Sequence, residues 1–267
     1  MIKPLTGKAM HTNQYFCAGF FNSVKMKKKL IITAAVFFSL LIVLWIVGRL
    51  TDMLQYYRIP TPSSEPNIMQ GEKVFSSNLK DPSPYNFIVF TSKYEDSINI
   101  AFMPDLQPGT RYIHRLCGMP GDIIEMKNGI FFVNNKNFDK KINLNNQYKI
   151  SSAESGLIDE DDMTAMEKSG GIYSVSKDSF IVTFDNVLMK KYESKIKLPA
   201  LYMVPNAQNG VFNWNHKEAY WTADNFGPLK IPSACYFVLG DNRHNSMDSR
   251  YIGFVKKEDI KGVVLKK

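Results

Sequence analysis

Cysteine and histidine are scarce in this chain, which narrows the kinds of site it can carry. Of 267 residues, three are cysteine and four are histidine. Cys17, Cys117 and Cys235 are too few for a disulfide framework, and no pair has metal-ligand spacing. The sequence also has no Cys/His/Asp cluster with metal-site spacing and no glycine-rich phosphate loop. We therefore expect neither a metal nor another cofactor.

The cysteines that matter for the fold are Cys117 and Cys235, which lie in apolar stretches. Free cysteine in such a context is usually a small buried hydrophobe. The sequence leaves open whether the two are close together and oxidised, which an environment outside the cytoplasm would allow.

A spaced aromatic–basic pattern of the RNA-binding kind is also missing, so the net charge of +8 does not indicate nucleic acid. Much of the positive charge comes from two clusters, one before an apolar run and one in the C-terminal tail: Lys25, Lys27, Lys28, Lys29, Lys256, Lys257, Lys261, Lys266 and Lys267. We expect no nucleic-acid partner. The length allows one large domain, or one domain with an inserted subdomain.

One long apolar run, residues 30–48, predicts a transmembrane helix. It contains no charge until Arg49, and a helix of about 20 residues spans about 30 Å, the thickness of a bilayer core. A cleaved signal peptide would have a shorter apolar core and a small-x-small site, and a buried core helix would have a polar face. The lysines before the run predict a cytoplasmic N-terminus. Residues 1–29 form the predicted cytoplasmic extension, with 1–25 expected to be unstructured.

A proline-rich segment follows the predicted anchor at residues 59–68, with the sequence Ile-Pro-Thr-Pro-Ser-Ser-Glu-Pro-Asn-Ile. Three prolines in ten residues exclude a helix and hold the backbone extended or turned. A stiff loop that presents hydroxyls close to a membrane suggests a nucleophile, and Ser63 is the candidate.

The rest of the chain reads as mostly β. Short β-rich runs bounded by turn residues predict strands at 73–75, 86–91, 98–103, 111–117, 235–239 and 263–265. Residues 123–126 and 130–133, joined by Lys-Asn-Gly, predict a hairpin. These runs divide a catalytic β core into a first part, 49–135, and a last part, 229–267.

Residues 136–228 are more polar and are expected to form an inserted β subdomain. A short helix is predicted over 161–168, strands over 175–187 and 198–204, and a turn over 225–228. The acidic patch at 159–162 is interpreted as a solvated surface, with a calcium site as the weaker alternative because the spacing of a known calcium loop is absent.

Residues 240–251 are the most polar stretch to follow directly on a predicted buried strand. They hold two Asp, two Asn, two Arg, two Ser and one His. Such a loop is expected either as a hydrogen-bonded corner, since Asp and Asn side chains bind nearby backbone groups, or as part of a reactive site. His244 is expected at the surface.

Four segments together resemble bacterial type I signal peptidases of the S26 serine peptidase family. Gly-Asp-Asn-Arg-x-Asn-Ser-x-Asp-Ser-Arg-Tyr-x-Gly-Phe-Val at 240–255 looks like the last signature of that family. Residues 112–122 resemble its Tyr-Ile-Lys-Arg-x-x-Gly-x-Pro-Gly-Asp motif, and 59–71 resemble Ile-Pro-Ser-x-Ser-Met-x-Pro-Thr-Leu-x-x-Gly. Residues 87–90 match the short apolar segment between them. Order and spacing agree, while 136–220 contribute little.

The resemblance implies a role for each matching residue. Ser63 falls on the nucleophile, and Thr61 on a hydroxyl that would hold the oxyanion together with the Ser63 N–H. Ser246 falls on a serine that orients the general base. The remaining matches fall on an ion pair under the site, Asp248 and Arg250, and on the walls of pockets for small substrate residues, Ile59, Pro60, Ile113 and Tyr57.

Two positions depart from the family's pattern. His114 stands where the family has its general-base lysine, and Ser64 stands where methionine follows the nucleophile. Histidine needs no large pKa shift to act as a base near neutrality, and the related endoplasmic-reticulum and archaeal-type signal peptidases use it here. Its shorter side chain needs an orienting carboxylate or a closer serine. Asp248 is the first candidate for a Ser-His-Asp triad, and Asp241, otherwise a supporting residue, is the second.

The resemblance implies a membrane-bound serine endopeptidase that cleaves signal peptides from exported preproteins after small residues, at Ala-x-Ala sites. The expected fold is an antiparallel β core of coiled sheets behind a transmembrane helix. The catalytic domain would lie outside the bacterial inner membrane, with an apolar edge on the lipid bilayer and the secretion translocon as a further partner. The alternative is an inactive relative that acts as a membrane-anchored binding or scaffold protein.

Overall fold

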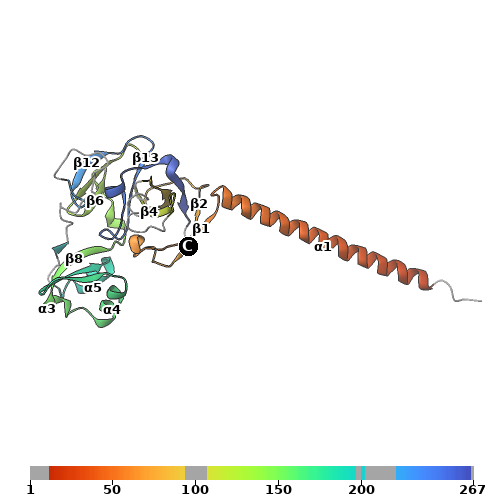
Figure 1. Ribbon diagram of the computed structural model, residues 1–267, viewed down its shortest axis with the longest axis horizontal. Helices are drawn as coiled ribbons and strands as arrows, with labels where there is room; N and C mark the ends of the chain where they lie inside the picture. Colours follow the sequence, from red (N-terminus) through yellow and green to blue (C-terminus); the bar gives the residue numbers. More distant parts are fainter. Residues whose placement is uncertain (1–11, 94–106, 197–199, 202–220, 266–267) are drawn as a thin grey trace, which may run out of the picture. The chain divides into compact units, whose positions relative to one another are not determined.

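The structure is a computed structural model that describes residues 12–93, 107–196, 200–201 and 221–265. The predicted strand 98–103 lies outside these residues, as do 1–11 of the predicted extension. Two compact units are present, Met1–Thr51 and Asp52–Lys267. The first contains one long helix, and the second contains all the strands (Figure 1).

Helix α1 runs from Thr12 to Leu50. Its segment Met26–Leu50 is long and apolar enough to cross a membrane by length and composition. The expectation that residues 1–25 are unstructured is wrong for 12–25, which continue the helix. The sequence explains the difference: no proline occurs between residues 12 and 50, so nothing stops a helix from extending ahead of the apolar run.

The main sheet of the second unit has seven antiparallel strands, and three of the predicted site residues, Tyr57, Ile113 and His114, lie on it. Its order is β1-β2-β15-β3-β4-β13-β14. The bounds are Gln55–Arg58 for β1, Lys73–Ser77 for β2, Phe87–Thr91 for β3, Arg111–Gly118 for β4, Cys235–Leu239 for β13, Val255–Lys256 for β14 and Ile260–Val264 for β15. The strands expected at 73–75, 86–91, 111–117, 235–239 and 263–265 are confirmed to within one or a few residues.

A second sheet has the order β12-β5-β6-β7, with bounds Phe226–Lys230, Ile123–Lys127, Ile130–Val133 and Lys136–Asn137. The predicted hairpin is β5–β6, and its turn places Asn128 at φ 49° and Gly129 at φ 77°, the left-handed region that this turn needs. Phe131 of this sheet stacks on Phe237 of the main sheet with ring centroids 5.6 Å apart. The two sheets therefore share a core.

The turn expected at 225–228 lies earlier. Thr222 and Asn225 close it through paired backbone hydrogen bonds, and strand β12 begins at Phe226. The strand is irregular at Gly227, where a Cβ would lie 2.7 Å from the Ile124 carbonyl oxygen. The close approach to β5, which sequence does not show, places the glycine inside a strand.

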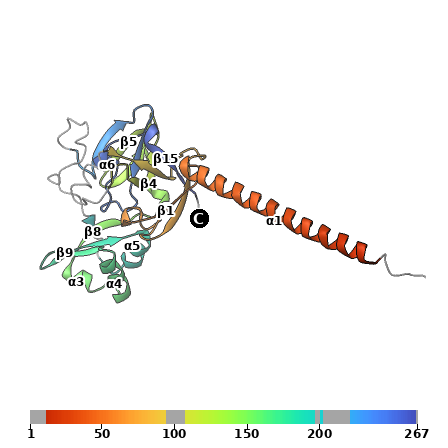
Figure 2. The ribbon, with the colours of Figure 1, turned by 45° about the vertical axis from the view of Figure 1, so that its right-hand side comes forward.

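A third sheet forms a separate subdomain with the order β11-β8-β10-β9 (Figures 1 and 2). These strands are Ala200–Leu201, Asn146–Ser151, Ser179–Phe184 and Ile172–Ser176, with helices α3 (Ser152–Ser155), α4 (Glu160–Lys168) and α5 (Asn186–Tyr192). The subdomain has its own apolar core, which includes Ile150, Phe184 and Tyr192. It spans fewer residues than the expected 136–228, because β7 and β12 pair in the second sheet.

Inside this subdomain the predictions had mixed outcomes. The helix expected over 161–168 is α4. The single strand expected over 175–187 is wrong: it is two strands followed by α5, which begins where the Asp185 carboxylate accepts hydrogen bonds from the N–H groups of Val187 and Leu188. Of the strand expected over 198–204, residues 200–201 are described and form β11.

Two carboxylates of the acidic patch at 159–162 are paired with a lysine of the same subdomain. Asp159 and Asp162 each form an ion pair with Lys191, at 2.8 and 2.6 Å. In the described part of the chain, no group of three or more His, Cys, Asp or Glu side chains is arranged to hold a metal ion.

Both core cysteines are free thiols. Cys117 is buried and its thiol donates to the Arg115 carbonyl at 3.4 Å, while burial raises the pKa of that thiol. Cys235 is half-buried. The buried-hydrophobe interpretation is thus confirmed for Cys117.

The described residues also contain three short 3-10 helices and one short α-helix: η1 (Pro62–Ser64), η2 (Asp139–Lys141), α6 (Ser249–Ile252) and η3 (Lys257–Asp259). Two of them lie in the segments that resembled signature motifs. Helix η1 is inside the proline-rich loop, and α6 is inside the polar loop after β13.

Candidate active site

The proline-rich loop holds Ser63 in a single turn of 3-10 helix. Thr61 precedes the turn in an extended conformation, and Pro62 is its first residue, where its missing N–H is not needed. The Ser63 hydroxyl lies 3.3 Å from the Thr61 hydroxyl in an exposed position. The two hydroxyls that the resemblance singled out are therefore side by side and open to solvent.

Ser64, the neighbouring serine, is held differently. Its side chain is buried, with 1% of the residue exposed, and its hydroxyl donates to the Ile113 carbonyl at 3.0 Å. A buried hydroxyl engaged in this way cannot meet a substrate without breaking the loop. Of the two serines, Ser63 has the exposure that a nucleophile needs.

His114 lies on β4 and is buried, with its ring beside Phe90 at a centroid distance of 5.6 Å. Its Nε2 is 3.0 Å from the Met247 carbonyl oxygen. Because a carbonyl can only accept, Nε2 carries the proton in the neutral ring and Nδ1 carries the lone pair. Nδ1 is buried and has no hydrogen-bond partner among the described residues.

The charge state of His114 follows from its surroundings. Burial lowers the pKa of the imidazole, and the nearby carboxylates of Asp248 and Asp241 oppose this only in part. The ring is therefore neutral at neutral pH. A neutral imidazole with an unpaired nitrogen is in the right form to accept a proton.

Asp248 and Arg250 form a fully buried ion pair under the polar loop. Arg250 donates through Nε and Nη2 to the two carboxylate oxygens at 2.9 and 2.8 Å. The carboxylate also accepts from the N–H groups of Gly240 and Arg250 at 3.0 and 3.2 Å. Burial alone would raise the pKa of Asp248, but the charge and hydrogen bonds of Arg250 outweigh it and hold this pKa below its usual value.

The expected triad is not formed in this structure. Asp248 already accepts four hydrogen bonds, so its oxygens are occupied, and neither nitrogen of His114 binds it. The charge of Asp248 raises the pKa of the His114 imidazole, without a hydrogen bond between the two side chains. Ser63 likewise has no hydrogen bond to His114 among the described residues, where its hydroxyl contacts Thr61.

Asp241, the second candidate for orienting His114, has other partners. Its carboxylate accepts from Arg115 Nε at 2.7 Å and Nη2 at 2.5 Å, and from the Asn67 amide at 2.7 Å. Asn67 lies in the same proline-rich loop as Ser63, and Arg115 follows His114 in β4. Asp241 thus joins three segments that carry predicted site residues, which agrees with a supporting position.

Ser246 lies against the nucleophile loop. A Cβ at Gly240 would be 2.1 Å from the Ser246 hydroxyl oxygen and 2.7 Å from the Ser63 carbonyl oxygen. Only glycine leaves room for both. The Ser246 hydroxyl is buried and, within the described ranges, has no hydrogen-bond partner. Two unpaired buried polar atoms, this hydroxyl and His114 Nδ1, therefore belong to the same predicted site.

The predicted pocket walls lie on the other flank of the loop. Ile59 is buried in a small apolar cluster to which Tyr57 and Ile113 add partly buried side chains. Pro60 is exposed, and its carbonyl accepts from the Gln70 side chain. The Tyr57 hydroxyl accepts from Arg111 at 2.7 Å. Ile59 contributes mainly to packing, whereas Pro60, Ile113 and Tyr57 keep accessible surface.

Several supporting contacts were not foreseen from the sequence. Asn242 donates its N–H to the Ser63 carbonyl at 3.1 Å and its side-chain amide to the Pro62 carbonyl at 3.2 Å. Arg243 forms a bidentate ion pair with the Asp139 carboxylate, with hydrogen bonds of 2.8 and 2.6 Å. Arg243 and Asn242 stand inside the signature segment, but the sequence did not show that Asn242 binds the nucleophile loop or that Arg243 pairs with Asp139, which lies outside the signature segments.

His244 was expected at the surface, and this is wrong. Its side chain is 1% exposed, and its Nδ1 accepts from the Gln147 N–H at 3.1 Å. The inserted subdomain supplies this contact from strand β8. An insert whose path is not known from sequence can bury a residue that otherwise reads as a surface loop.

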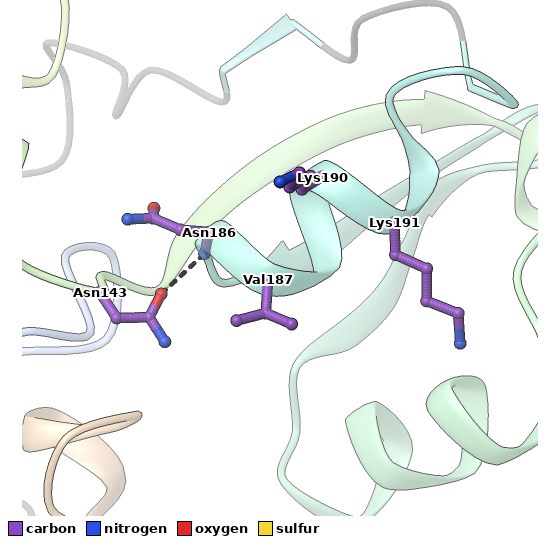
Figure 3. A pocket seen from close by; sticks show the side chains of 5 residues that line it. All are labelled: Asn143, Asn186, Val187, Lys190 and Lys191. Carbon is purple, nitrogen blue, oxygen red and sulfur yellow. Dashed lines mark hydrogen bonds between the residues drawn. The ribbon is translucent and has the colours of Figure 1, made fainter.

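One cavity among the described residues is lined by side chains from outside the signature segments. It has a volume of about 540 Å³ and is lined by Asn143, Asn186, Val187, Lys190 and Lys191 (Figure 3). Figure 3 shows the Asn143 side chain accepting a hydrogen bond from the Asn186 N–H, at 2.9 Å. None of its lining residues belongs to the signature segments, so the cavity adds nothing to the site.

Together these features describe a mostly β protein with a half-buried serine on a rigid loop and a buried neutral histidine on the strand to which that loop is hydrogen-bonded. Residues 30–266 match the family model described as signal peptidase, peptidase S26. The chain belongs to that family.

Curated relatives carry the same family name. One is signal peptidase I of Buchnera aphidicola subsp. Baizongia pistaciae, 30% identical over 89% of this chain and 76% of the relative. Another is signal peptidase I P of Bacillus subtilis subsp. natto, 28% identical over 82% and 84% of the two chains. Among solved structures, a signal peptidase I from Enterococcus faecalis is 22% identical with a TM-score of 0.30, covering 70% of this chain and 98% of that chain.

Proposed function

We propose that this chain is a membrane-anchored serine endopeptidase that removes signal peptides from exported preproteins after small residues. One observation carries the proposal: the exposed Ser63 hydroxyl lies on a loop bound to the strand of His114, whose Nδ1 is unpaired among the described residues. Family membership supplies the reaction class, since the relatives are named signal peptidases.

In the proposed reaction, Nδ1 of His114 takes the proton of the Ser63 hydroxyl as its oxygen attacks the scissile carbonyl. The Thr61 hydroxyl and the Ser63 N–H hold the developing oxyanion, and each such donor contributes about 3 kcal/mol because the charge appears only in the transition state. His114 then protonates the leaving amine. Water, activated by the same nitrogen, releases the signal peptide from Ser63.

The remaining residues keep these groups in place. The Met247 carbonyl fixes the ring orientation and tautomer of His114, and the Ser246 hydroxyl is the group that would steady Nδ1 during proton transfer. The Asp248–Arg250 pair holds the loop that carries both Ser246 and Met247. Pro60, Ile113 and Tyr57 bound the space for small substrate side chains.

The cellular arrangement follows from α1. Lysines precede the apolar segment Met26–Leu50, so we place the N-terminus in the cytoplasm and the second unit outside the bacterial inner membrane. The substrates would be the signal peptides of exported preproteins arriving from the secretion translocon.

A second candidate is a binding or scaffold protein that holds signal peptides without cutting them. The specific observation in its favour is that Ser63 and His114 share no hydrogen bond among the described residues. Catalytic hydrogen bonds are often loose without substrate and tighten when it binds, so this geometry is compatible with both candidates.

Cleavage of a preprotein by the full-length chain in detergent separates them. We expect cleavage by wild type, a loss of at least about 1,000-fold for Ser63→Ala, and a similar loss for His114→Ala. An inactive wild-type chain that still binds the preprotein would favour the scaffold. Undiminished cleavage by Ser63→Ala would overturn the nucleophile assignment.

A further inference from the structure

One hydrogen bond connects the nucleophile loop directly to the strand of the base. The Ser64 hydroxyl donates to the Ile113 carbonyl, so the residue after Ser63 is tied to the residue before His114. Consecutive Cα atoms are about 3.8 Å apart. The hydrogen bond therefore holds the chain neighbours of Ser63 and His114 together, and this limits the distance between the two reacting residues.

The other flank of Ser63 is also fixed. Its carbonyl accepts from the N–H of Asn242, which lies in the same loop as Met247, the residue that binds His114. The loop turn itself is closed by the Glu65 N–H donating to the Pro62 carbonyl. Ser64 is the residue that ties this turn to β4 by a side chain.

We propose that Ser64 is a positioning residue for catalysis, which sets the distance between the Ser63 hydroxyl and His114. This inference rests on the proposed function. The motif that the loop resembles has methionine at this position and lysine at the base. A methionine side chain cannot donate a hydrogen bond, and an imidazole reaches less far than a lysine. The serine hydroxyl supplies the anchor that a short base needs.

If Ser64 had only a structural role, a different result would be expected. Loss of a buried hydroxyl that only packs would lower stability and leave the turnover of folded enzyme unchanged. Ser76 provides the matched control: its hydroxyl is equally buried, at 1% exposure, in strand β2 of the same sheet, and it has no hydrogen-bond partner among the described residues.

The test measures kcat and KM for a peptide substrate with the full chain in detergent, for wild type, Ser64→Ala, Ser64→Thr and Ser76→Ala. Melting midpoints are recorded for each, and the assay is run well below them. We expect Ser64→Ala to lower kcat by about 10- to 100-fold with KM within about twofold, since a displacement near 1 Å has effects of this size. Ser64→Thr, which keeps the hydroxyl, should recover most of the loss, and Ser76→Ala should match wild type.

Two results would overturn the inference while leaving the proposed function intact: wild-type kcat in Ser64→Ala, or a Ser64→Ala loss that Ser76→Ala reproduces. A folded Ser64→Thr no more active than Ser64→Ala would do the same. If wild type fails to cleave, or Ser63→Ala cleaves as well as wild type, the proposed function itself fails and the role of Ser64 fails with it.

Discussion

Replacing Asp248 with asparagine should destabilise the second unit strongly. The Asp248 carboxylate accepts four hydrogen bonds and pairs with Arg250, and both residues are fully buried. Asparagine keeps the shape but removes the charge and one acceptor, so Arg250 remains buried with only Asp224, 3.9 Å away, as a carboxylate partner among the described contacts. Removing one partner of a buried pair costs about 3–5 kcal/mol.

For a domain of this size, each kcal/mol lowers the melting midpoint by about 2–4 °C, so the expected shift is about 6–20 °C. Circular dichroism of the full-length chain in detergent would measure it. The control is Asp159→Asn, which removes an exposed carboxylate that also forms ion pairs and should change the midpoint little.

A double variant sharpens the test. Asp248→Asn combined with Arg250→Met removes the uncompensated charge, so it should melt above the single variant Asp248→Asn. The reasoning is refuted if Asp248→Asn melts within about 2 °C of wild type, a shift that corresponds to about 1 kcal/mol or less. A double variant that melts below the single one would also contradict the buried-charge argument.

Three further outcomes are expected. Burial lowers the pKa of His114, so the base is neutral at neutral pH and kcat/KM should be at its maximum there. The value of kcat/KM should fall only below about pH 6.5, where the imidazole becomes protonated. A fall in kcat/KM that begins above pH 8 would contradict a histidine base. Thr61→Val should lower kcat by about 100-fold while Thr61→Ser keeps most of it, and equal kcat in both would remove the oxyanion role. Gly240→Ala should abolish cleavage and lower the melting midpoint, because its Cβ overlaps the Ser246 hydroxyl and the Ser63 carbonyl; normal cleavage and stability would show that the loop is not tightly packed there.

Much of the fold was predictable because its strands are short apolar runs with clear ends. Strand β13, the hairpin β5–β6 and strand β4 all follow this pattern. The error at residues 175–187 has a local cause: Asp185 caps helix α5 directly after strand β10 ends at Phe184, and the sequence does not mark this change. The extension of α1 ahead of residue 26 was missed, although residues 12–25 contain no proline that would stop a helix.

In the candidate site, the sequence pointed to residues but not to their hydrogen-bond partners. The spacing of the signature segments pointed to Ser63 and His114, but it could not tell which neighbour takes the carboxylate of Asp248. Arg250 lies two residues away on the same loop and occupies both oxygens, so His114 is held by the Met247 carbonyl instead. Competition among nearby donors is decided by three-dimensional geometry, which the order of residues does not contain.

The most direct test of the account is to find the serine that is acylated during turnover. Full-length chain and preprotein would be mixed, quenched in acid before steady state, digested and sequenced by mass spectrometry. The account predicts the signal-peptide acyl group on Ser63, with no adduct in Ser63→Ala. An adduct on Ser64, or an adduct that survives in Ser63→Ala, would contradict it.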